Sequence, residues 1–269
     1  MHQFFTSLNF NRKKIGVVCH DAGAANILGN LVAKFKNSTK FLCYTEGPAK
    51  KIWSNLNLVH LETDSAKTLL DSCELIMTGT GKNILEHNVR KKQKNNIAIL
   101  DHWVNYRERF IRNDLEILPD EIWVSDKYAY NKARSCFPNI QIVEQENDYL
   151  KAQIHEVSSY KIEKKKGTTN ILYLLEPIRD MWAGDKVAGE FQALDFFVQA
   201  IPDLNMGKDL SIILKPHPSD PTDKYDDWVR LSNLANIHIE KEKNLASLLA
   251  WSDVVVGCET YAMVLAIRV

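Results

Sequence analysis

The chain has 269 residues, of which 45% are hydrophobic and 25% charged, a composition typical of a packed globular protein long enough for two domains. Lys and Arg together number 34, as do Asp and Glu, so the formal net charge is +0 and the chain lacks the global positive field that gathers nucleic acid or anionic membrane. We therefore expect no nucleic-acid partner, and any site for an anion to be local.

The N-terminus and the cysteines indicate a cytoplasmic protein. Residues 1–14 lack a long apolar run with a small-residue cleavage site, and no stretch approaches the roughly 20 apolar residues that a membrane helix needs. The 5 cysteines form no CxxC pair and the 8 histidines no HxxxH pair, so we expect reduced thiols in the core and no structural zinc. We predict no metal, no cofactor and no membrane span.

In the first half of the chain, short apolar runs alternate with amphipathic stretches of helical length. Such alternation favours βαβ units and a parallel sheet. Residues 1–160 are therefore predicted to form a Rossmann-like domain. Its strands are predicted at 15–19, 40–44, 58–61, 74–79, 97–100, 121–125 and 140–143, with helices at 24–36 and 127–137.

A polar, highly charged stretch over residues 145–169 is predicted to link two domains. The alternation then resumes, and residues 161–269 are predicted to form a second Rossmann-like domain, incomplete because it has four strands where five or six are usual. The predicted fold class is α/β, with two Rossmann-like parallel-sheet domains facing across a cleft. The later strands are predicted at 170–176, 211–214, 237–240 and 253–257, and the helices at 189–201, 226–234, 245–252 and from residue 258 onward.

The loop after the first strand carries two polar residues before a small-residue turn. Ligands of open α/β sheets bind at the carboxyl ends of strands, where helix N-termini attract anions. His20 and Asp21 stand at this point, and Gly23 follows them in a turn that lets a ligand or backbone approach closely. Either His20 or Asp21 could take a proton from an acceptor hydroxyl as general base. The alternative is that Asp21 caps the following helix, which does not exclude catalysis.

The loop Thr78–Asn83 has a superficial likeness to a phosphate-binding P-loop. Ile76 stands where that loop needs glycine, and Asn83 replaces the hydroxyl that binds magnesium. We predict instead a glycine turn that lines the cleft, with Thr80 and Lys82 as ligand contacts.

Residues 101–110 are rich in polar and aromatic groups. Aromatic faces together with carboxylate and amide groups suit a sugar. We expect Asp101 and His102 to lie on the acceptor side of the cleft. The alternative is that the aromatic residues of this segment pack on the first domain, which applies more to Tyr106 and Phe110 than to Asp101 and His102.

The most specific signal is the run Lys215-Pro216-His217-Pro218 after a predicted strand. The two prolines make a rigid turn, which fixes His217 where a ligand phosphate would lie. Lys215 beside it can help to stabilise charge on a departing phosphate. The alternative is a turn whose histidine faces solvent.

This K-P-H-P run resembles families of the GT-B superfamily, namely bacterial sialyl- and polysialyltransferases, capsule Kdo transferases and CDP-glycerol glycerophosphotransferases. The resemblance covers about residues 211–266. It includes a later leucine-rich segment that leads to Asp253 and Gly257, then a turn with a hydroxyl side chain and an apolar helix.

The resemblance implies roles for residues of the second domain. His217 would contact the donor phosphate, and Thr260 would face the same phosphate from a helix N-terminus. Glu259 would reach the nucleotide ribose, although this chain has Cys-Glu where those families have a serine-rich turn. Glu176 ends a predicted strand on the side of the other domain, and Arg179 after it is either directed at a phosphate or part of a surface ion pair.

These predictions point to a glycosyltransferase of surface polysaccharide biosynthesis. It would transfer a sugar from a nucleotide-sugar, CMP- or CDP-linked by the resemblance, bound mainly by the second domain, to a carbohydrate acceptor on the first. The chain has no D-x-D triplet, which fits metal-independent stabilisation of the leaving group. The alternatives are a nucleotide-sugar epimerase or hydrolase of the same fold, and a non-catalytic nucleotide- or carbohydrate-binding protein.

Overall fold

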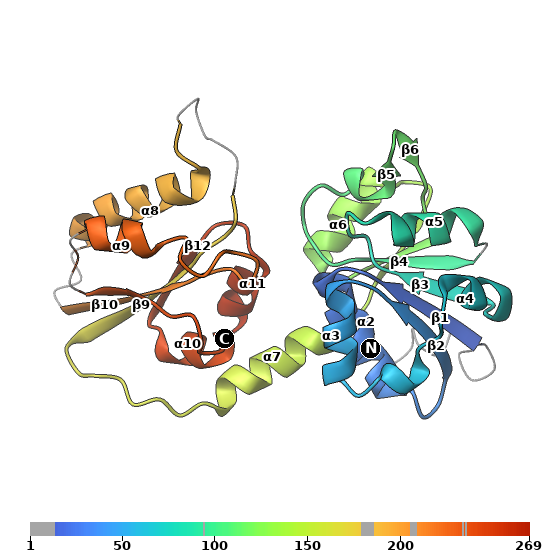
Figure 1. Ribbon diagram of the computed structural model, residues 1–269, viewed down its shortest axis with the longest axis horizontal. Coiled ribbons are helices and arrows are strands. Elements are labelled where there is room, and N and C mark those ends of the chain that lie inside the picture. Colours follow the sequence, from blue (N-terminus) through green and yellow to red (C-terminus); the bar gives the residue numbers. More distant parts are fainter. Residues whose placement is uncertain (1–13, 94, 179–185, 205–208, 233, 235) are drawn as a thin grey trace. The chain divides into compact units, whose positions relative to one another are not determined.

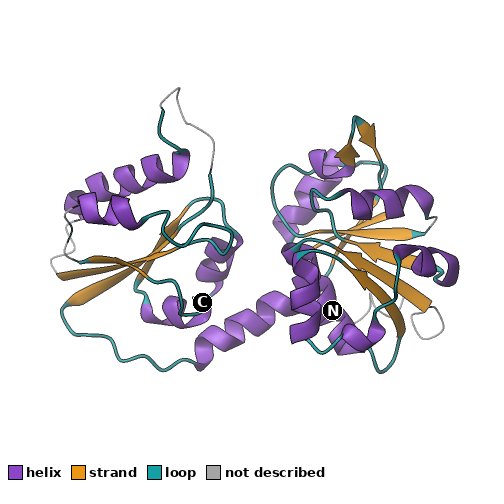
Figure 2. Ribbon diagram, viewed as in Figure 1, coloured by secondary structure: helices purple, strands orange, loops and turns teal. Residues whose placement is uncertain are grey.

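The computed structural model describes residues 14–93, 95–178, 186–204, 209–232, 234 and 236–269. The chain divides into two compact units, Met1–Tyr149 and Leu150–Val269 (Figure 1). Strands alternate with helices in both units (Figure 2). The predicted fold class, α/β with two Rossmann-like parallel-sheet domains, is confirmed.

The first unit is built on a six-stranded parallel sheet of order β2-β1-β3-β4-β7-β8. The direction of winding reverses between β1 and β3, and such a switch point is where open α/β sheets bind their ligands. The strands are β1 (Lys14–Cys19), β2 (Lys40–Thr45), β3 (Leu75–Thr78), β4 (Asn96–Leu100), β7 (Glu121–Val124) and β8 (Gln141–Glu144), and a short antiparallel pair, β5 (Ile111–Arg112) and β6 (Leu115–Glu116), stands apart.

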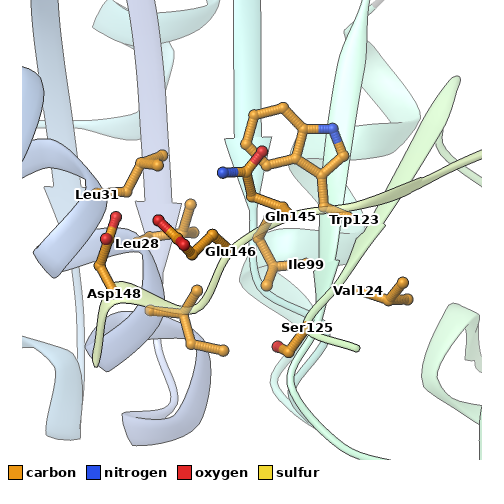
Figure 3. Close-up of a pocket in the computed structure, with 10 residues that line it drawn as sticks. Leu28, Leu31, Ile99, Trp123, Val124, Ser125, Gln145, Glu146 and Asp148 are labelled. Atoms are coloured by element: carbon orange, nitrogen blue, oxygen red, sulfur yellow. The ribbon is translucent and has the colours of Figure 1, made fainter. Parts of the chain in front are cut away.

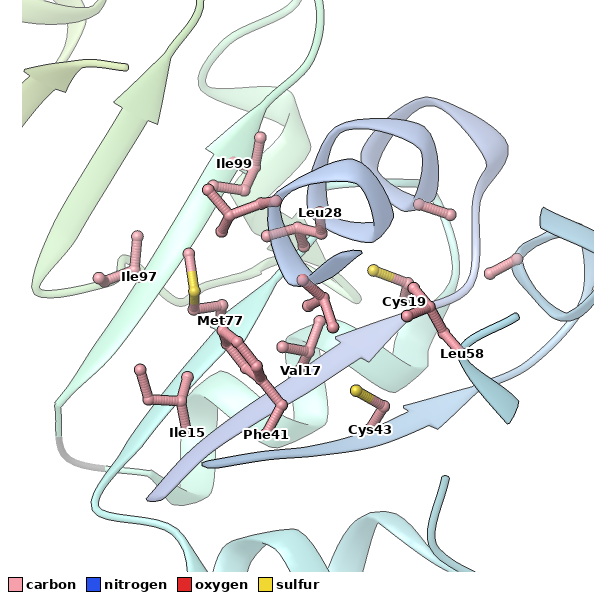
Figure 4. Packing of buried hydrophobic residues seen from close by; sticks show 14 of the residues in the cluster. Ile15, Val17, Cys19, Leu28, Phe41, Cys43, Leu58, Met77, Ile97 and Ile99 are labelled. Carbon is pink, nitrogen blue, oxygen red and sulfur yellow. The ribbon is translucent and has the colours of Figure 1, made fainter. Parts of the chain in front are cut away.

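Helices cover both faces of this sheet because the side chains of its strands alternate between two apolar cores. Ile15 and Val17 of β1 point to the core beneath the first two helices (Figure 4). Val18 points to the opposite core. The helices are α2 (Ala22–Phe35), α3 (Pro48–Asn55), α4 (Ala66–Ser72), α5 (Ile84–Lys92) and α6 (Lys127–Cys136), with short turns η2 (Val59–Leu61) and η3 (Glu108–Phe110).

The strand predicted at residues 58–61 is wrong. Leu58 is buried in the core and Leu61 packs partly against it, whereas Val59 is 52% exposed and the chain turns as the short helix η2. An apolar run of four residues is too short to distinguish a strand from a turn that buries one leucine.

The second unit has a four-stranded parallel sheet of order β11-β10-β9-β12. Its winding reverses between β9 and β12, which is the switch point of this sheet. The strands are β9 (Thr168–Leu174), β10 (Asp209–Lys215), β11 (Ile237–Ile239) and β12 (Val254–Gly257), and the helices are α8 (Gly189–Ala200), η4 (Ile201–Leu204), α9 (Asp226–Ser232), α10 (Leu245–Trp251) and α11 (Tyr261–Arg268).

The side chains of β9 also point alternately into two apolar cores, one on each face of the sheet. Ile171 and Tyr173 pack with the buried residues of α8, and Leu172 and Leu174 pack with those of α10 and α11. The strands and helices predicted for this half of the chain all appear in the structure within a few residues of their expected ends.

The segment predicted to be a linker contains a helix, α7 (Asp148–Ser159). Its Leu150, Ile154 and Val157 pack into the core of the second unit. These three apolar positions recur at helical spacing, but the polar residues between them hid the pattern. The division between the units accordingly lies in the first turn of this helix, between Tyr149 and Leu150.

All five cysteines are free thiols, as predicted, and Cys19, Cys43 and Cys73 are buried. Within the described ranges of the chain, no helix is long and apolar enough to cross a membrane.

Candidate functional site

The loops after β1 and β3 meet at the switch point of the first sheet. Val18 pairs with Thr78, so the residues that follow each strand lie at the same edge. The backbone N–H of Lys82 donates to Oδ2 of Asp21 at 3.1 Å. A Cβ atom on Gly81 would lie 1.3 Å from this oxygen, so the absence of a side chain there lets the carboxylate reach the loop.

His20 and Asp21 form a hydrogen-bonded pair. Nδ1 of His20 lies 2.8 Å from Oδ1 of Asp21. An ionised carboxylate only accepts hydrogen bonds, so Nδ1 carries the hydrogen and Nε2 is the basic nitrogen of the neutral ring. Asp21 occupies the N-cap position of α2, but its side chain makes no capping hydrogen bond. In this His20–Asp21 dyad, Asp21 therefore orients the imidazole instead of capping the helix.

Three neighbours fix the position of His20. Its N–H donates to Oε1 of Glu86 at 3.0 Å, and its carbonyl accepts the N–H of Ala49 at 3.1 Å. The ring lies against Gly47, where a Cβ atom would come within 2.7 Å of Nε2. Gly47 also has φ of 51°, which favours glycine. The His20 side chain keeps 23% exposure, so its ring is accessible from solvent.

Two buried charged residues of α5 support this edge, and the sequence analysis missed both. Glu86 is 0% exposed, and burial raises its pKa to about 7, opposed by the N–H of His20. Nη1 of Arg90 donates to Thr78 Oγ1 at 3.0 Å and to the Gly79 carbonyl at 2.7 Å, and burial lowers the pKa of Arg90 to about 10. Their i, i+4 spacing places them on one helix face, but such pairs usually face solvent.

Glu86 makes the free energy of unfolding depend on pH. Because the pKa of this carboxyl is raised from 4.5 to about 7 by folding, the folded state binds its proton more tightly than the unfolded chain does. Stability should fall as pH rises through this window, by on the order of 1 kcal/mol per pH unit, and level off above it. Urea unfolding from pH 5 to 8 measures this. Glu86→Gln should abolish the slope and exposed Glu74→Gln should not; parallel curves for Glu86→Gln and wild type would contradict it.

Asp101 lies at the N-terminus of α2. A Cβ atom on Gly23 would lie 1.8 Å from its Oδ2, and its Oδ1 is 3.3 Å from Nη1 of Arg109. The pKa of neighbouring His102 is lowered by burial, with Asp101 acting in the opposite sense. Asp101 thus supplies a counter-charge to this helix N-terminus.

The aromatic residues of the same segment belong to the core. Tyr106 is 2% and Phe110 0% exposed, and both pack with side chains of α6. The packing interpretation of these two residues is confirmed.

Most polar groups of the turn after β3 are hydrogen-bonded to other parts of the first unit. Thr80 is 1% exposed and its hydroxyl donates to the Ile99 carbonyl at 2.9 Å, which joins the ends of β3 and β4. Arg112 donates to the carbonyls of Gly81 and Lys82. The Lys82 residue itself is exposed, so its ammonium is the accessible group of this turn.

A small pocket near this edge does not include the dyad. It lies between α2 and the chain that follows β7 and β8, with Leu28, Leu31 and Trp123 among its lining residues (Figure 3). It has room for about one water molecule. Asp148 on its rim is paired with Lys34 at 2.8 Å.

The second sheet also gathers predicted residues at its switch point. Leu174 of β9 pairs with Lys215 of β10 and with Gly257 of β12. The residue two positions after each of these paired residues is polar, so three polar residues lie at one edge of the sheet. They are Glu176, His217 and Glu259.

Two hydrogen bonds with Ser219 fix the tautomer of the neutral His217 ring. The Ser219 N–H donates to Nδ1 at 3.2 Å, and Oγ of Ser219 lies 2.8 Å from the same nitrogen. Nδ1 is therefore an acceptor, and the ring hydrogen is on Nε2.

The Lys215 ammonium is largely committed to the protein. It donates to the carbonyls of Lys241 and Lys243 at 3.1 and 2.7 Å. Burial lowers its pKa, and Glu240 opposes the shift. These two bonds use two of the three N–H groups of the ammonium.

Glu176 and Glu259 meet between β9 and β12. The N–H of Glu259 donates to the Glu176 carboxylate, whose pKa is raised by burial and then by the Glu259 charge. Burial and these carboxylates also raise the pKa of the Cys258 thiol. Thr260 stands at the N-cap of α11 without a capping hydrogen bond from its side chain. Arg179 lies outside the described residues.

The described part of the chain contains no group of three or more His, Cys, Asp or Glu side chains that could hold a metal ion.

Two successive Rossmann-like domains, each with polar residues at its switch point, define a GT-B-like fold. No protein-family model and no curated protein sequence matches the chain.

Solved structures share this fold at low sequence identity. The S. aureus MnaA–UDP co-structure has a TM-score of 0.64 at 12% identity, covering 93% of this chain and 75% of that one. The UDP-GlcNAc 2-epimerase of Methanocaldococcus jannaschii, in complex with UDP-GlcNAc and UDP, has a TM-score of 0.58 at 11% identity, with coverage of 91% and 78%. The Neisseria meningitidis UDP-GlcNAc 2-epimerase bound to UDP-GlcNAc has a TM-score of 0.57 at 11% identity, with coverage of 91% and 77%.

Proposed function

We propose that the protein is an enzyme acting on a nucleotide-sugar, and specifically a glycosyltransferase. The observation that carries this proposal is the clustering of polar residues at the switch point of each sheet, a different set in each unit. The likeness of the fold to proteins solved with UDP and UDP-GlcNAc supports a nucleotide-sugar as ligand.

The second unit would bind the donor. Nε2–H of His217 would donate to a phosphate oxygen, and the remaining N–H of Lys215 would add positive charge. The Thr260 hydroxyl at the N-terminus of α11 would face the same phosphate. Glu259, held by Glu176, would accept hydrogen bonds from the ribose. These groups would stabilise the leaving nucleotide without a metal ion.

The first unit would bind the acceptor and remove its proton. Nε2 of His20 takes the proton as the acceptor oxygen attacks the anomeric carbon, and the electrons of the broken bond go to the nucleotide phosphate. Asp101 and Asp21 place negative charge at the starts of α2 and α5, which disfavours a phosphate here. His102 and Lys82 would contact the carbohydrate acceptor.

A second candidate is a nucleotide-sugar epimerase or hydrolase, which is supported by the likeness of the fold to solved structures described as UDP-GlcNAc 2-epimerases. Product analysis after incubation with UDP-GlcNAc separates the two. A new UDP-sugar, or free sugar released without acceptor, supports the second candidate. Nucleotide release that depends on a carbohydrate acceptor supports transfer.

Nucleotide binding gives the first test of the donor site. Among CMP, CDP, UDP, GDP and ADP, a pyrimidine nucleotide is expected to raise the melting temperature, because a ligand that binds only the folded state stabilises it. His217→Ala should weaken the affinity about 10- to 100-fold, the value of a hydrogen bond to a charged group. His238→Ala, at an exposed position of β11, is the matched control. No shift with any nucleotide would support a non-catalytic binding protein and contradict the proposal.

A further inference from the structure

Glu86 lies behind the His20–Asp21 dyad, on the side away from solvent. The residue is 0% exposed and comes from α5, far from His20 in the sequence. Oε1 accepts the His20 N–H at 3.0 Å, whereas Oε2 has no hydrogen-bond partner. A Cβ atom on Gly79 would lie 2.7 Å from Oε1 and 2.5 Å from Cβ of Ala24, so glycine keeps open the space that the carboxylate occupies.

The burial of the Glu86 carboxyl lowers the stability of the folded protein. A buried carboxyl oxygen without a partner costs about 1–3 kcal/mol or more, and a leucine would fill the same space at no such cost. The charged and titratable groups that face Glu86 are Cys19, His20 and Asp21 from β1 and its loop, and Arg90 from its own helix. None of the described ion pairs joins the Glu86 carboxylate to an arginine within 4.0 Å, so no salt bridge offsets the cost of its burial. The energetic cost therefore points to a role for the bond to His20.

A chain of hydrogen bonds runs from Glu86 through the dyad. The Glu86 carboxylate accepts the backbone N–H of His20, the His20 ring donates to Asp21, and the Asp21 carboxylate accepts the backbone N–H of Lys82. A rotation of the peptide that carries the His20 N–H also rotates the Cα–Cβ bond of the residue, so the ring would leave Asp21. A shift of about 1 Å at such a group is enough to cost about 10²-fold in rate.

We propose that Glu86 is a positioning residue: it sets the direction of the His20 imidazole by holding the His20 backbone, and it does not touch the substrate. This inference rests on the proposed function only for its effect on rate. The effect on the position of the dyad stands apart from any activity.

Amide hydrogen exchange of the full chain tests the positioning directly. Glu86→Gln keeps an oxygen acceptor and should leave the His20 amide protected. Glu86→Leu should reduce protection of the His20 amide at least about 10-fold, and that of the Lys82 amide with it, because both depend on the same chain of bonds. Asn88→Leu, on the exposed face of the same helix, is the matched control. Unchanged protection of the His20 amide in Glu86→Leu would overturn the proposal.

Kinetics give the second readout. In Glu86→Leu, kcat should fall about 10- to 100-fold with unchanged nucleotide affinity, and Glu86→Gln should restore it. If wild type has no activity, the proposed function fails and the exchange result alone decides the role of Glu86. If Glu86→Leu retains its kcat, positioning is overturned while the function stands.

A second variant covers the case in which Glu86→Leu does not fold. Glu86→Asp shortens the side chain by one CH₂ and should show the same loss of His20 amide protection. Full protection of the His20 amide in Glu86→Asp would overturn the proposal.

Discussion

Replacement of His20 by glutamine is expected to lower kcat by about 10²- to 10⁴-fold at neutral pH, the usual contribution of a general base. Glutamine preserves polarity at this position but has no basic nitrogen to take the acceptor proton. Nucleotide affinity should not change, because the residues proposed to bind the donor belong to the second unit. Steady-state kinetics with saturating donor, together with a thermal shift by the nucleotide, measure the two effects separately.

Asp21→Asn tests the same base more specifically, because it leaves the His20 side chain in place. An asparagine amide can donate to Nδ1, which favours the tautomer with hydrogen on Nε2 and removes the base while leaving the shape nearly unchanged. The loss of kcat should therefore approach that of the His20 variant. Asp71→Asn, exposed on α4, is the control. Wild-type kcat in Asp21→Asn would mean that the dyad is not the base.

The strands that carry both sites could be predicted from the sequence because their apolar runs are continuous. β1, β3, β9 and β10 are buried by helices on both faces, so they read as uninterrupted hydrophobic segments between loops. Helix α7 could not be recognised in the same way. It buries only one narrow stripe against the second unit, and its other positions have the composition of a linker.

The candidate site could be predicted only as separate loops. The positions of His20, Asp21 and His217 after strands were visible in the sequence, but strand order was not, so the meeting of Glu176 with Glu259 required the pairing of β9 with β12. The choice of His20 over Asp21 as the proposed base also depended on geometry, namely on the hydrogen bond between the two side chains.

Buried charges were the largest omission, because a charged residue on a predicted helix is normally assigned to its solvent face. Glu86 and Arg90 contradict that rule for one reason: the loops that they support have free backbone groups turned toward α5. A sequence shows the charge of such a residue but not the carbonyl or N–H that receives it.

The His217 turn is joined by a hydrogen bond to a second buried charge cluster, formed by Lys224, Glu190 and Asp220. Nζ of Lys224 lies 2.6 Å from Oε1 of Glu190 and 2.8 Å from Oδ1 of Asp220, and the two carboxylates are 3% and 0% exposed. Burial alone would lower the pKa of Lys224, but its bonds to Asp220 and Glu190 outweigh burial and raise it. The N–H of Asp220 donates to the His217 carbonyl at 2.9 Å, so the cluster joins this turn to the start of α8.

Lys224→Met is expected to destabilise the second unit by about 3–5 kcal/mol, because it leaves two buried carboxylates without a counter-charge. Urea unfolding measures the loss. Lys241→Met, which removes a surface pair with Asp226, should cost no more than about 1 kcal/mol. Adding Glu190→Gln to Lys224→Met removes one of the unpaired charges and should recover part of the stability. If Lys224→Met and Lys241→Met unfold at the same urea concentration, the cluster is not what holds the turn, and His217 must owe its position to the two prolines and Ser219 alone.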